Sequence, residues 1–262
     1  MKTARYYGIE DIRYEELPVP NCGEKDVLIK VAYAGICGSD LHIYKKGMFI
    51  QNIPETMGHE FSGTVIKTGS KVHSLQAGDR VTANPMVTCG NCIACRTERR
   101  GSCETLGFIG EVRPGCFAEY IALPQEDVIK APPDINLKKL ALAEPLAVAL
   151  NICRQAKPAP TDKVLIVGPG PIGLLTALVL KNVCGLENPT ILGRSPARLS
   201  IAKALGMKTT TQLGDDSYFD LIIEAAGNET ALSTAVAHAL PGGKICVVSI
   251  FEDDFIFDIN TI

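Results

Sequence analysis

Four cysteines lie close together in the first half of the chain and follow the spacing C-x2-C-x2-C-x7-C, namely Cys89, Cys92, Cys95 and Cys103. Their thiolates can converge only where the backbone turns tightly, and Gly90 and Gly101 help it to turn. An all-thiolate tetrahedral shell is typical of a closed, structural zinc site. An iron–sulfur cluster is disfavoured because bacterial ferredoxin runs have a shorter last gap followed by proline, whereas Glu104 follows Cys103. A nucleic-acid zinc module is disfavoured because it usually pairs its ligands as two well-separated couples.

A second set of candidate metal donors lies upstream, in the segments Cys37–His42 and Gly58–Glu60. Taken singly, a histidine or cysteine in such a segment is more often a packed or surface residue than a ligand. In a chain that also contains the four-cysteine segment, residues 89–103, these donors are more significant than each would be alone, because the motifs then have to be judged together. Their interpretation depends on what the rest of the chain encodes.

A glycine-rich turn follows the apolar run Val164–Val167 and matches G-x-G-x-x-G. Between a strand and a helix, this pattern is the dinucleotide fingerprint, with the pyrophosphate over the helix N-terminus. The sequence therefore predicts a dinucleotide site at five residues of this turn, Gly168, Gly170, Pro171, Ile172 and Gly173.

The end of the next predicted strand indicates which dinucleotide is preferred. An NAD enzyme places Asp or Glu there to bind the ribose hydroxyls. This chain has Gly193 at that position, followed by Arg194, with Arg198 one helical turn later. The missing carboxylate and the added cation favour NADP over NAD, because a guanidinium can bind a 2′-phosphate. The alternative is that Arg194 is only a solvated loop residue, in which case the enzyme would not distinguish NADP from NAD.

The elements that must position these motifs change character at a proline-bearing joint, residues 155–160. Before it, short alternating apolar runs such as Val27–Tyr33 predict the strands of a distorted barrel. After it, apolar strands alternate with helices, as in Ile172–Val183, which predicts a parallel sheet with crossover helices. We therefore expect an α/β protein with two domains, 1–157 and 158–262.

Composition excludes several classes of protein. The 262 residues are 46% hydrophobic and 21% charged, enough to bury a full core, and the net charge of −3 gives no reason to expect nucleic acid or a membrane as partner. The most apolar stretch, Leu140–Leu150, is far too short for a membrane span. The residues after Met1 do not resemble a signal peptide, so we expect a cytoplasmic protein whose ten cysteines stay reduced.

The order of these motifs along the whole chain resembles the zinc-containing medium-chain dehydrogenases, in the branch of sorbitol, butanediol, threonine and galactitol-1-phosphate dehydrogenases. The resemblance implies a GroES-like distorted β-barrel catalytic domain followed by a Rossmann doubly wound sheet. It implies hydride transfer between a secondary alcohol, polyol or sugar-alcohol phosphate and NAD(P), with two zinc ions, one catalytic and one structural. It also implies association into a homodimer or homotetramer.

The resemblance carries roles onto single positions. Cys37 and His59 match the two fixed ligands of the catalytic zinc, and Glu60 matches the carboxylate that completes the site or exchanges with water. Glu144 matches the further acid that binds the metal directly or through water in the polyol branch. Ser39 and His42 match the proton relay to solvent.

The sequence departs from the family pattern in two places. Between Thr211 and Phe219 a helix of the family is missing, and the chain stops at Ile262, shortly after the predicted strand Lys244–Ile250. The Rossmann domain is therefore expected to be incomplete, in either a fragment or a natural shortened form, and relatives usually pair their subunits through the region that is missing. The alternative function is a truncated, catalytically inactive zinc- and nucleotide-binding protein. A zinc-finger interaction module has support only from the four cysteines.

Overall fold

The chain folds into two compact units, Met1–Glu144 (unit 1) and Pro145–Ile262 (unit 2), in a computed structural model that describes residues 1–187 and 189–258. The boundary lies in the first turn of helix α4 (Ala143–Ala156), earlier than the predicted boundary at 157/158. The reason is packing: Ala149, Ile152 and Cys153 of α4 belong to the hydrophobic core of unit 2. The proline-bearing joint therefore follows the first helix of unit 2.

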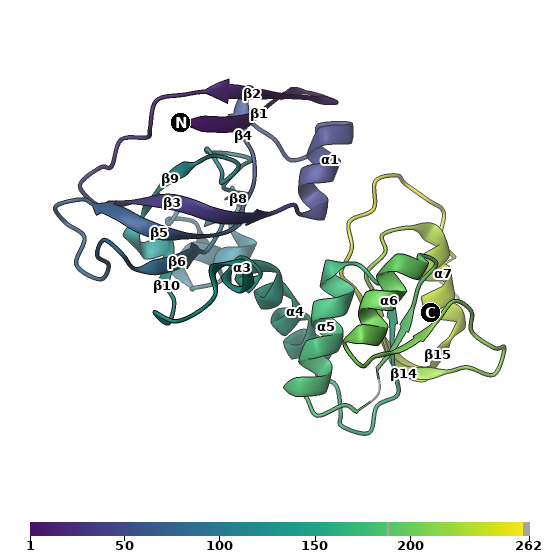
Figure 1. Cartoon of the computed structure of the whole chain (residues 1–262). Coiled ribbons are helices and arrows are strands. Elements are labelled where there is room, and N and C mark those ends of the chain that lie inside the picture. The colour runs from purple at the N-terminus through teal and green to yellow at the C-terminus, as the bar shows by residue number, and fades with distance from the viewer. Residues whose placement is uncertain (188, 259–262) are drawn as a thin grey trace. The chain divides into compact units, whose positions relative to one another are not determined.

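Unit 1 is built on an antiparallel five-stranded sheet of order β10-β6-β5-β3-β9 (Figure 1). Its apolar side chains, including Val27, Ile29 and Phe61, form the core of the unit. A three-stranded sheet of order β2-β1-β4 and the short pair β7-β8 complete the distorted barrel. The strands are β1 (Lys2–Gly8), β2 (Asp11–Glu16), β3 (Asp26–Gly35), β4 (Glu55–Thr56), β5 (Glu60–Thr68), β6 (Arg80–Ala83), β7 (Met86–Val87), β8 (Gly107–Phe108), β9 (Tyr120–Pro124) and β10 (Val128–Lys130).

The helices of unit 1 are short. They are α1 (Gly38–Lys46), α2 (Ile93–Arg96), α3 (Leu137–Leu140) and the 3₁₀ turns η1 (Arg100–Ser102) and η2 (Gln125–Asp127). Helix α1 follows directly after β3, and its C-cap Gly47 has φ 67°, a left-handed conformation that suits glycine. This helix matters for function because it carries the residues that follow Cys37.

Unit 2 is a parallel five-stranded sheet of order β13-β12-β11-β14-β15. Its strands are β11 (Val164–Val167), β12 (Thr190–Leu192), β13 (Lys208–Thr210), β14 (Phe219–Glu224) and β15 (Ala239–Val247), and its further helices are α5 (Pro171–Asn182), α6 (Pro196–Ala204) and α7 (Glu229–Ala237). Strand β11 lies at the centre of the sheet. Strands β12 and β13 follow on one side of it, and β14 and β15 on the other, as in doubly wound dinucleotide-binding folds.

The two faces of this sheet have separate hydrophobic cores, and successive side chains of β11 belong to one core and the other in turn. Val164 and Ile166 pack with α4, α5 and α6, whereas Leu165 and Val167 pack with α7. The continuous apolar run Val164–Val167 is therefore buried on both faces, as expected for a central parallel strand. No helix lies between β13 and β14, which confirms the departure predicted there.

The last strand begins earlier than predicted, at Ala239 rather than Lys244, and it ends at Val247. Ala239 pairs with Phe219, and the register then shifts so that Lys244 pairs with Leu221. The irregularity spans Pro241, which has no amide hydrogen for the ladder. Among the described residues, no helix is both long and apolar enough to cross a membrane.

Candidate metal centres and dinucleotide site

The four cysteines of residues 89–103 come together in space. Their sulfur atoms all lie within 4.8 Å of one another, in the neighbourhood of α2 and η1. The Cys89 sulfur is 3.9 Å from that of Cys95 and 3.6 Å from that of Cys103. With zinc–sulfur bonds of about 2.3 Å, a tetrahedral site needs sulfur atoms about 3.8 Å apart. The four sulfur atoms are therefore gathered closely enough to be the donor set of a tetrahedral metal site.

Backbone amides lower the pKa of two of these four thiols. The Cys89 N–H donates to the Cys103 sulfur at 3.4 Å, and this bond lowers the pKa of Cys103 to about 6. The Cys95 N–H donates to the Cys92 sulfur at 3.5 Å, and the pKa of Cys92 is also lowered, first by the Glu104 amide and then by Cys95. Burial raises the pKa of Cys95 to about 11. A divalent cation is thus needed to hold all four as thiolates.

The upstream set converges as well. The donor atoms of Cys37, His59 and Glu60 lie within 4.8 Å of one another. Cys37 is the N-cap of α1, while His59 precedes β5 and Glu60 opens it. Strand β3 brings the two segments together, because its last residue, Gly35, pairs with Glu60. A Cβ at Gly35 would come within 2.2 Å of the Glu60 carboxylate, so any larger residue there would displace this carboxylate from its present position.

The surroundings of His59 favour positive charge. Burial lowers the pKa of His59, but the Cys37 thiolate and the Asp40 and Glu144 carboxylates outweigh burial and raise it to about 9. Burial raises the pKa of Glu60, since its negative charge is costly there. A thiolate, an imidazole and buried carboxylates that together favour a cation are the donor set of a zinc site with an open position. The residues present therefore fit a metal.

Glu144 lies near this set without joining it. It is half-buried and contributes electrostatically to His59 and Glu60, but its carboxylate is not within the group of donors that lie 4.8 Å apart. Burial raises the pKa of Glu144 as it does that of Glu60. Glu60 rather than Glu144 is thus placed with Cys37 and His59 in this structure.

The two predicted relay residues share one element. Ser39 and His42 are both half-buried on α1, three residues apart, a spacing that puts side chains on one face of a helix. Helix α1 begins at the candidate ligand Cys37, so the pair starts beside the candidate metal site. Their role as a proton relay stays a prediction.

Two further acidic residues lie near the metal donors, and the sequence predicted neither of them as part of the metal site. Asp40 is buried and accepts the N–H of Cys37 at 2.8 Å and that of Gly58, so it ties together the backbone beside both Cys37 and His59. Glu111 is also buried, in the electrostatic field of His59, and burial raises its pKa. Asp40 could have been expected at a helix start, because it stands three residues after the N-cap Cys37. No sequence pattern indicates that Glu111 would lie near the metal donors.

The glycine turn adopts the dinucleotide-binding form. Gly168 follows β11 with φ 114°, and Gly170 is the N-cap of α5, whose first residue is Pro171. A Cβ at Gly173 would come within 2.0 Å of the Gly168 carbonyl oxygen, so the third glycine permits close packing of helix on turn. Free amides at the start of α5 therefore face the position that a pyrophosphate takes.

The second strand ends as predicted, with one added constraint. Gly193 follows β12, and Arg194 and Arg198 are exposed beside it at the start of α6. A Cβ at Gly193 would lie 2.5 Å from Cγ of Pro169, within the glycine turn. Glycine at 193 and proline at 169 therefore fit one another, and an acidic side chain at 193 does not fit beside Pro169.

Comparisons with known proteins show which family the chain is similar to. Residues 23–133 match the alcohol dehydrogenase GroES-like domain. The chain is 35% identical to the L-threonine 3-dehydrogenase of Marinomonas sp. (strain MWYL1), covering 100% of this chain and 81% of that protein. It is 34% identical to the sorbitol dehydrogenase of Bacillus subtilis (strain 168), covering 95% of this chain and 75% of that protein.

A solved structure extends the likeness to three dimensions. A zinc-binding dehydrogenase from Sinorhizobium meliloti 1021, described as bound to NADP, superposes with a TM-score of 0.92 at 29% identity, covering 98% of this chain and 79% of that one. The fold, the order of the motifs and the two relatives above agree. The chain therefore belongs to the zinc-containing medium-chain alcohol and polyol dehydrogenases, in the branch that includes threonine and sorbitol dehydrogenases.

Proposed function

We propose that the chain is an NADP-preferring, zinc-dependent dehydrogenase that oxidises secondary alcohols, polyols or sugar-alcohol phosphates. The observation that carries the proposal is a combination within one chain. Unit 1 brings a thiol, an imidazole and a carboxylate to one point, and unit 2 has a glycine turn at the centre of a parallel sheet. Each feature alone also occurs in proteins of unrelated activity, but the two together match a metal-assisted hydride transfer.

Two zinc ions per chain are part of the proposal. Cys37, His59 and Glu60 would hold the catalytic ion, with Glu144 as the further acid that the family resemblance assigns to it, and the four cysteines would hold the structural ion. When bound, the catalytic zinc supplies a Lewis acid that polarises a substrate oxygen. Asp40 keeps the backbone around Cys37 and His59 fixed by accepting amides from both sides.

Ser39 and His42 would carry the substrate proton toward solvent. Both begin beside Cys37 on α1, and a hydroxyl followed by an imidazole can pass a proton along one helix face. Replacement of His42 by alanine tests this relay through the pH profile of alcohol oxidation, with cofactor affinity as the quantity that should not change.

The preference for NADP rests on residues 193 and 194. Gly193 offers no carboxylate to the ribose hydroxyls, and the tight contact with Pro169 leaves no room for one. Arg194 is exposed next to it, where its guanidinium can bind a 2′-phosphate bidentately. The NADP-bound relative supports the same cofactor class.

The proposal extends to the cellular location and the assembly of the chain. A cytoplasmic, reducing location suits a chain whose ten cysteines are all reduced and whose proposed sites need thiolates. A homodimer or homotetramer is what family resemblance suggests. Light scattering of the purified protein measures the number of copies directly.

The decisive experiment is an oxidation screen with zinc content measured on the same sample. Secondary alcohols, polyols, sugar-alcohol phosphates and L-threonine are each offered with NADP and with NAD, and absorbance at the reduced nicotinamide band is followed. We expect turnover with at least one substrate, faster or tighter with NADP, and two zinc ions per chain. Cofactor binding without turnover on any of them would favour the inactive binding protein instead.

A further inference from the structure

One charged side chain of unit 2 is in the interior and belongs to none of the sites described so far. Glu224 ends strand β14 and is 0% exposed, and it is the one charged residue in the buried interior among the described residues of unit 2. A charged group in such a place is costly unless it is fully hydrogen-bonded. Its partners therefore indicate what it is for.

The Glu224 carboxylate joins two separate loops. One oxygen, Oε1, accepts the N–H groups of Ala226 and Gly227 at 2.8 and 2.9 Å, in the turn directly after β14. The other oxygen, Oε2, accepts the hydroxyl of Ser249, in the loop after β15. The Val248 N–H donates to the Glu224 carbonyl at 3.0 Å, which adds a backbone bond between the same two segments.

The two loops are packed so closely that their positions depend on each other. Gly227 has φ 73°, and a Cβ there would come within 2.6 Å of the Ile250 carbonyl oxygen. On the other side, a Cβ at Gly168 would come within 2.8 Å of the Ala225 carbonyl oxygen. The turn after β14 is thus held between the glycine turn of the dinucleotide site and the loop after β15.

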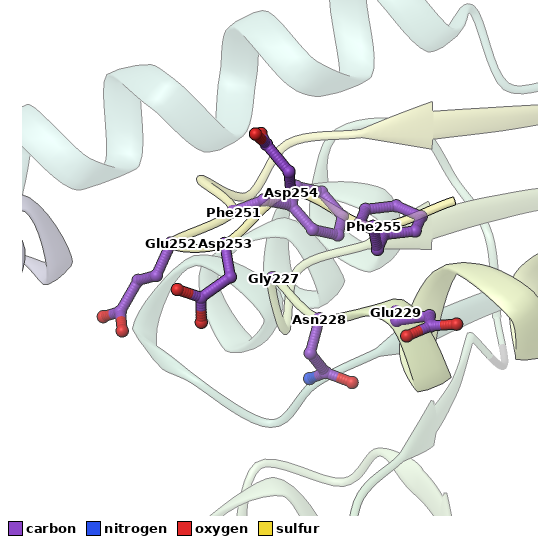
Figure 2. Close-up of a pocket in the computed structure, with 8 residues that line it drawn as sticks. All are labelled: Gly227, Asn228, Glu229, Phe251, Glu252, Asp253, Asp254 and Phe255. Carbon is purple, nitrogen blue, oxygen red and sulfur yellow. The ribbon is translucent and has the colours of Figure 1, made fainter. Parts of the chain in front are cut away.

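The strand order shows which part of a dinucleotide these loops face. The adenosine ribose is assigned to the end of β12, and the pyrophosphate to the turn after the central strand β11. The rest of the dinucleotide must then extend to the other side of β11, over β14 and β15. A pocket of about 340 Å³ opens there, and Gly227, Asn228 and Phe251 are among the residues that line it (Figure 2).

We propose that Glu224 is a positioning residue that fixes the two loops bordering the nicotinamide half of the bound dinucleotide. The inference rests on the proposed function, because it requires that unit 2 binds a dinucleotide. Glu224 does not touch the cofactor; it acts through Gly227 and Ser249. Loss of its carboxylate should free both loops while the adenosine side, at β12 and α6, keeps its structure.

The experiment compares two ligands that share the adenosine half. Binding of NADPH and of adenosine 2′,5′-bisphosphate is measured by calorimetry for the wild type and for Glu224→Ala, Glu224→Gln and Ser249→Ala. Glu187→Ala, an exposed acid of the same unit, is the matched control. We expect Glu224→Ala to weaken NADPH binding about ten- to a hundred-fold, because the two freed loops must then be ordered when the cofactor binds, and to change the bisphosphate affinity less than about twofold.

The milder variants keep the test decisive if Glu224→Ala does not fold. Glu224→Gln still accepts both amides and should keep most of the NADPH affinity. Ser249→Ala should also weaken NADPH binding more than bisphosphate binding, but by a smaller factor than Glu224→Ala. Equal weakening of both ligands, or no change in either, would overturn the role of Glu224. A wild type that binds neither NADPH nor the bisphosphate would overturn the proposed function, and this inference with it.

Discussion

Around the upstream metal donors, the charge of each residue is set by its neighbours. Cys37 and the carboxylates of Asp40 and Glu144 raise the pKa of His59 against the effect of burial, and burial in turn raises the pKa of Glu60. In the absence of a metal a proton on His59 offsets this negative charge. A divalent cation can take the place of that proton, so the site is organised for a metal before one binds.

Cys37→Ala tests this site at the level of one ligand. The variant should lose one of the two zinc ions and lower turnover by about 10³-fold or more, because Lewis-acid stabilisation contributes several kcal/mol to the transition state. It should stay folded, since the bond from the Cys37 N–H to Asp40 does not involve the thiol. Zinc content, turnover and thermal unfolding are measured together. Cys22→Ala, which removes a thiol in unit 1 outside both donor groups, should keep both ions and full activity.

Arg194→Ala tests the cofactor preference. A charge-assisted hydrogen bond contributes about 1.5–3 kcal/mol, so NADP affinity should fall about ten- to a hundred-fold while NAD affinity changes little. The difference should shrink as salt is added, because the exposed pair is screened. Titrations of both cofactors at two ionic strengths provide the measurement, with the exposed Arg99→Ala as control. Tighter binding of NAD than NADP by the wild type would contradict the assignment.

The reverse substitution needs the structure for its design. Gly193→Asp alone places a Cβ 2.5 Å from the Pro169 ring and would distort the glycine turn as well as add a carboxylate. The double variant Pro169→Ala, Gly193→Asp removes this clash. It should bind NAD more tightly than NADP, whereas Pro169→Ala alone should keep the wild-type order. Equal preference in the two variants would show that residue 193 does not select the cofactor.

At the level of elements, the four-cysteine segment differs from the rest of unit 1 because it has little apolar support. Neither α2 nor η1 buries a residue, and the contacts among its four sulfur atoms replace a core. Its folded form should therefore depend on the metal, as in small zinc domains that are unfolded without it.

Cys95→Ala should open this segment selectively. The expected result is loss of one zinc ion, a lower unfolding temperature and rapid exchange of amide hydrogens within residues 89–103, with slower exchange kept in strand β3. Hydrogen exchange followed by mass spectrometry locates the effect, and Cys22→Ala is again the control. Unchanged protection of residues 89–103 in zinc-depleted Cys95→Ala would show that the segment folds without metal.

The secondary-structure elements differ in how well they could be predicted from the sequence. Strand β11, the glycine turn and α5 could be placed within a residue or two, because an apolar run, three glycines and a proline at the first helical position agree locally. The start of β15 was missed because Pro241 and the two glycines after it argue against a strand. The prolines after α4, on which the predicted boundary at 157/158 rests, mark the end of a helix, whereas the two compact units divide at Glu144/Pro145 because α4 packs into the core of unit 2.

Residues whose partners are far away in the sequence could not be predicted as part of a site. The four cysteines and the pair His59–Glu60 could be proposed from spacing and resemblance. Glu224 could not, because its role depends on Ser249, which becomes its neighbour only when β14 pairs with β15. Local patterns predict local partners, whereas a buried carboxylate has meaning only with the fold around it.

At the scale of the whole molecule, each unit has its own hydrophobic core and its own candidate ligand. Unit 1 has the core around Ile29 and Phe61 and both candidate metal sites, while unit 2 has the cores on the two faces of its parallel sheet and the glycine turn. Ligands that bind only folded protein stabilise the unit that holds them. Metal and dinucleotide should therefore act on different parts of the unfolding profile.

Differential scanning calorimetry with each ligand tests this separation. NADPH at a hundred times its dissociation constant contributes about 2.7 kcal/mol and should raise the transition of unit 2 by roughly 10 °C. A zinc chelator should instead lower the transition of unit 1. Hydrogen exchange assigns each transition, through β11 for unit 2 and β3 for unit 1, and Arg194→Ala should show a smaller NADPH shift as the control. A single transition that both ligands move equally would mean that the two units unfold as one cooperative body, so that metal bound in unit 1 stabilises the dinucleotide fold of unit 2 as strongly as its own.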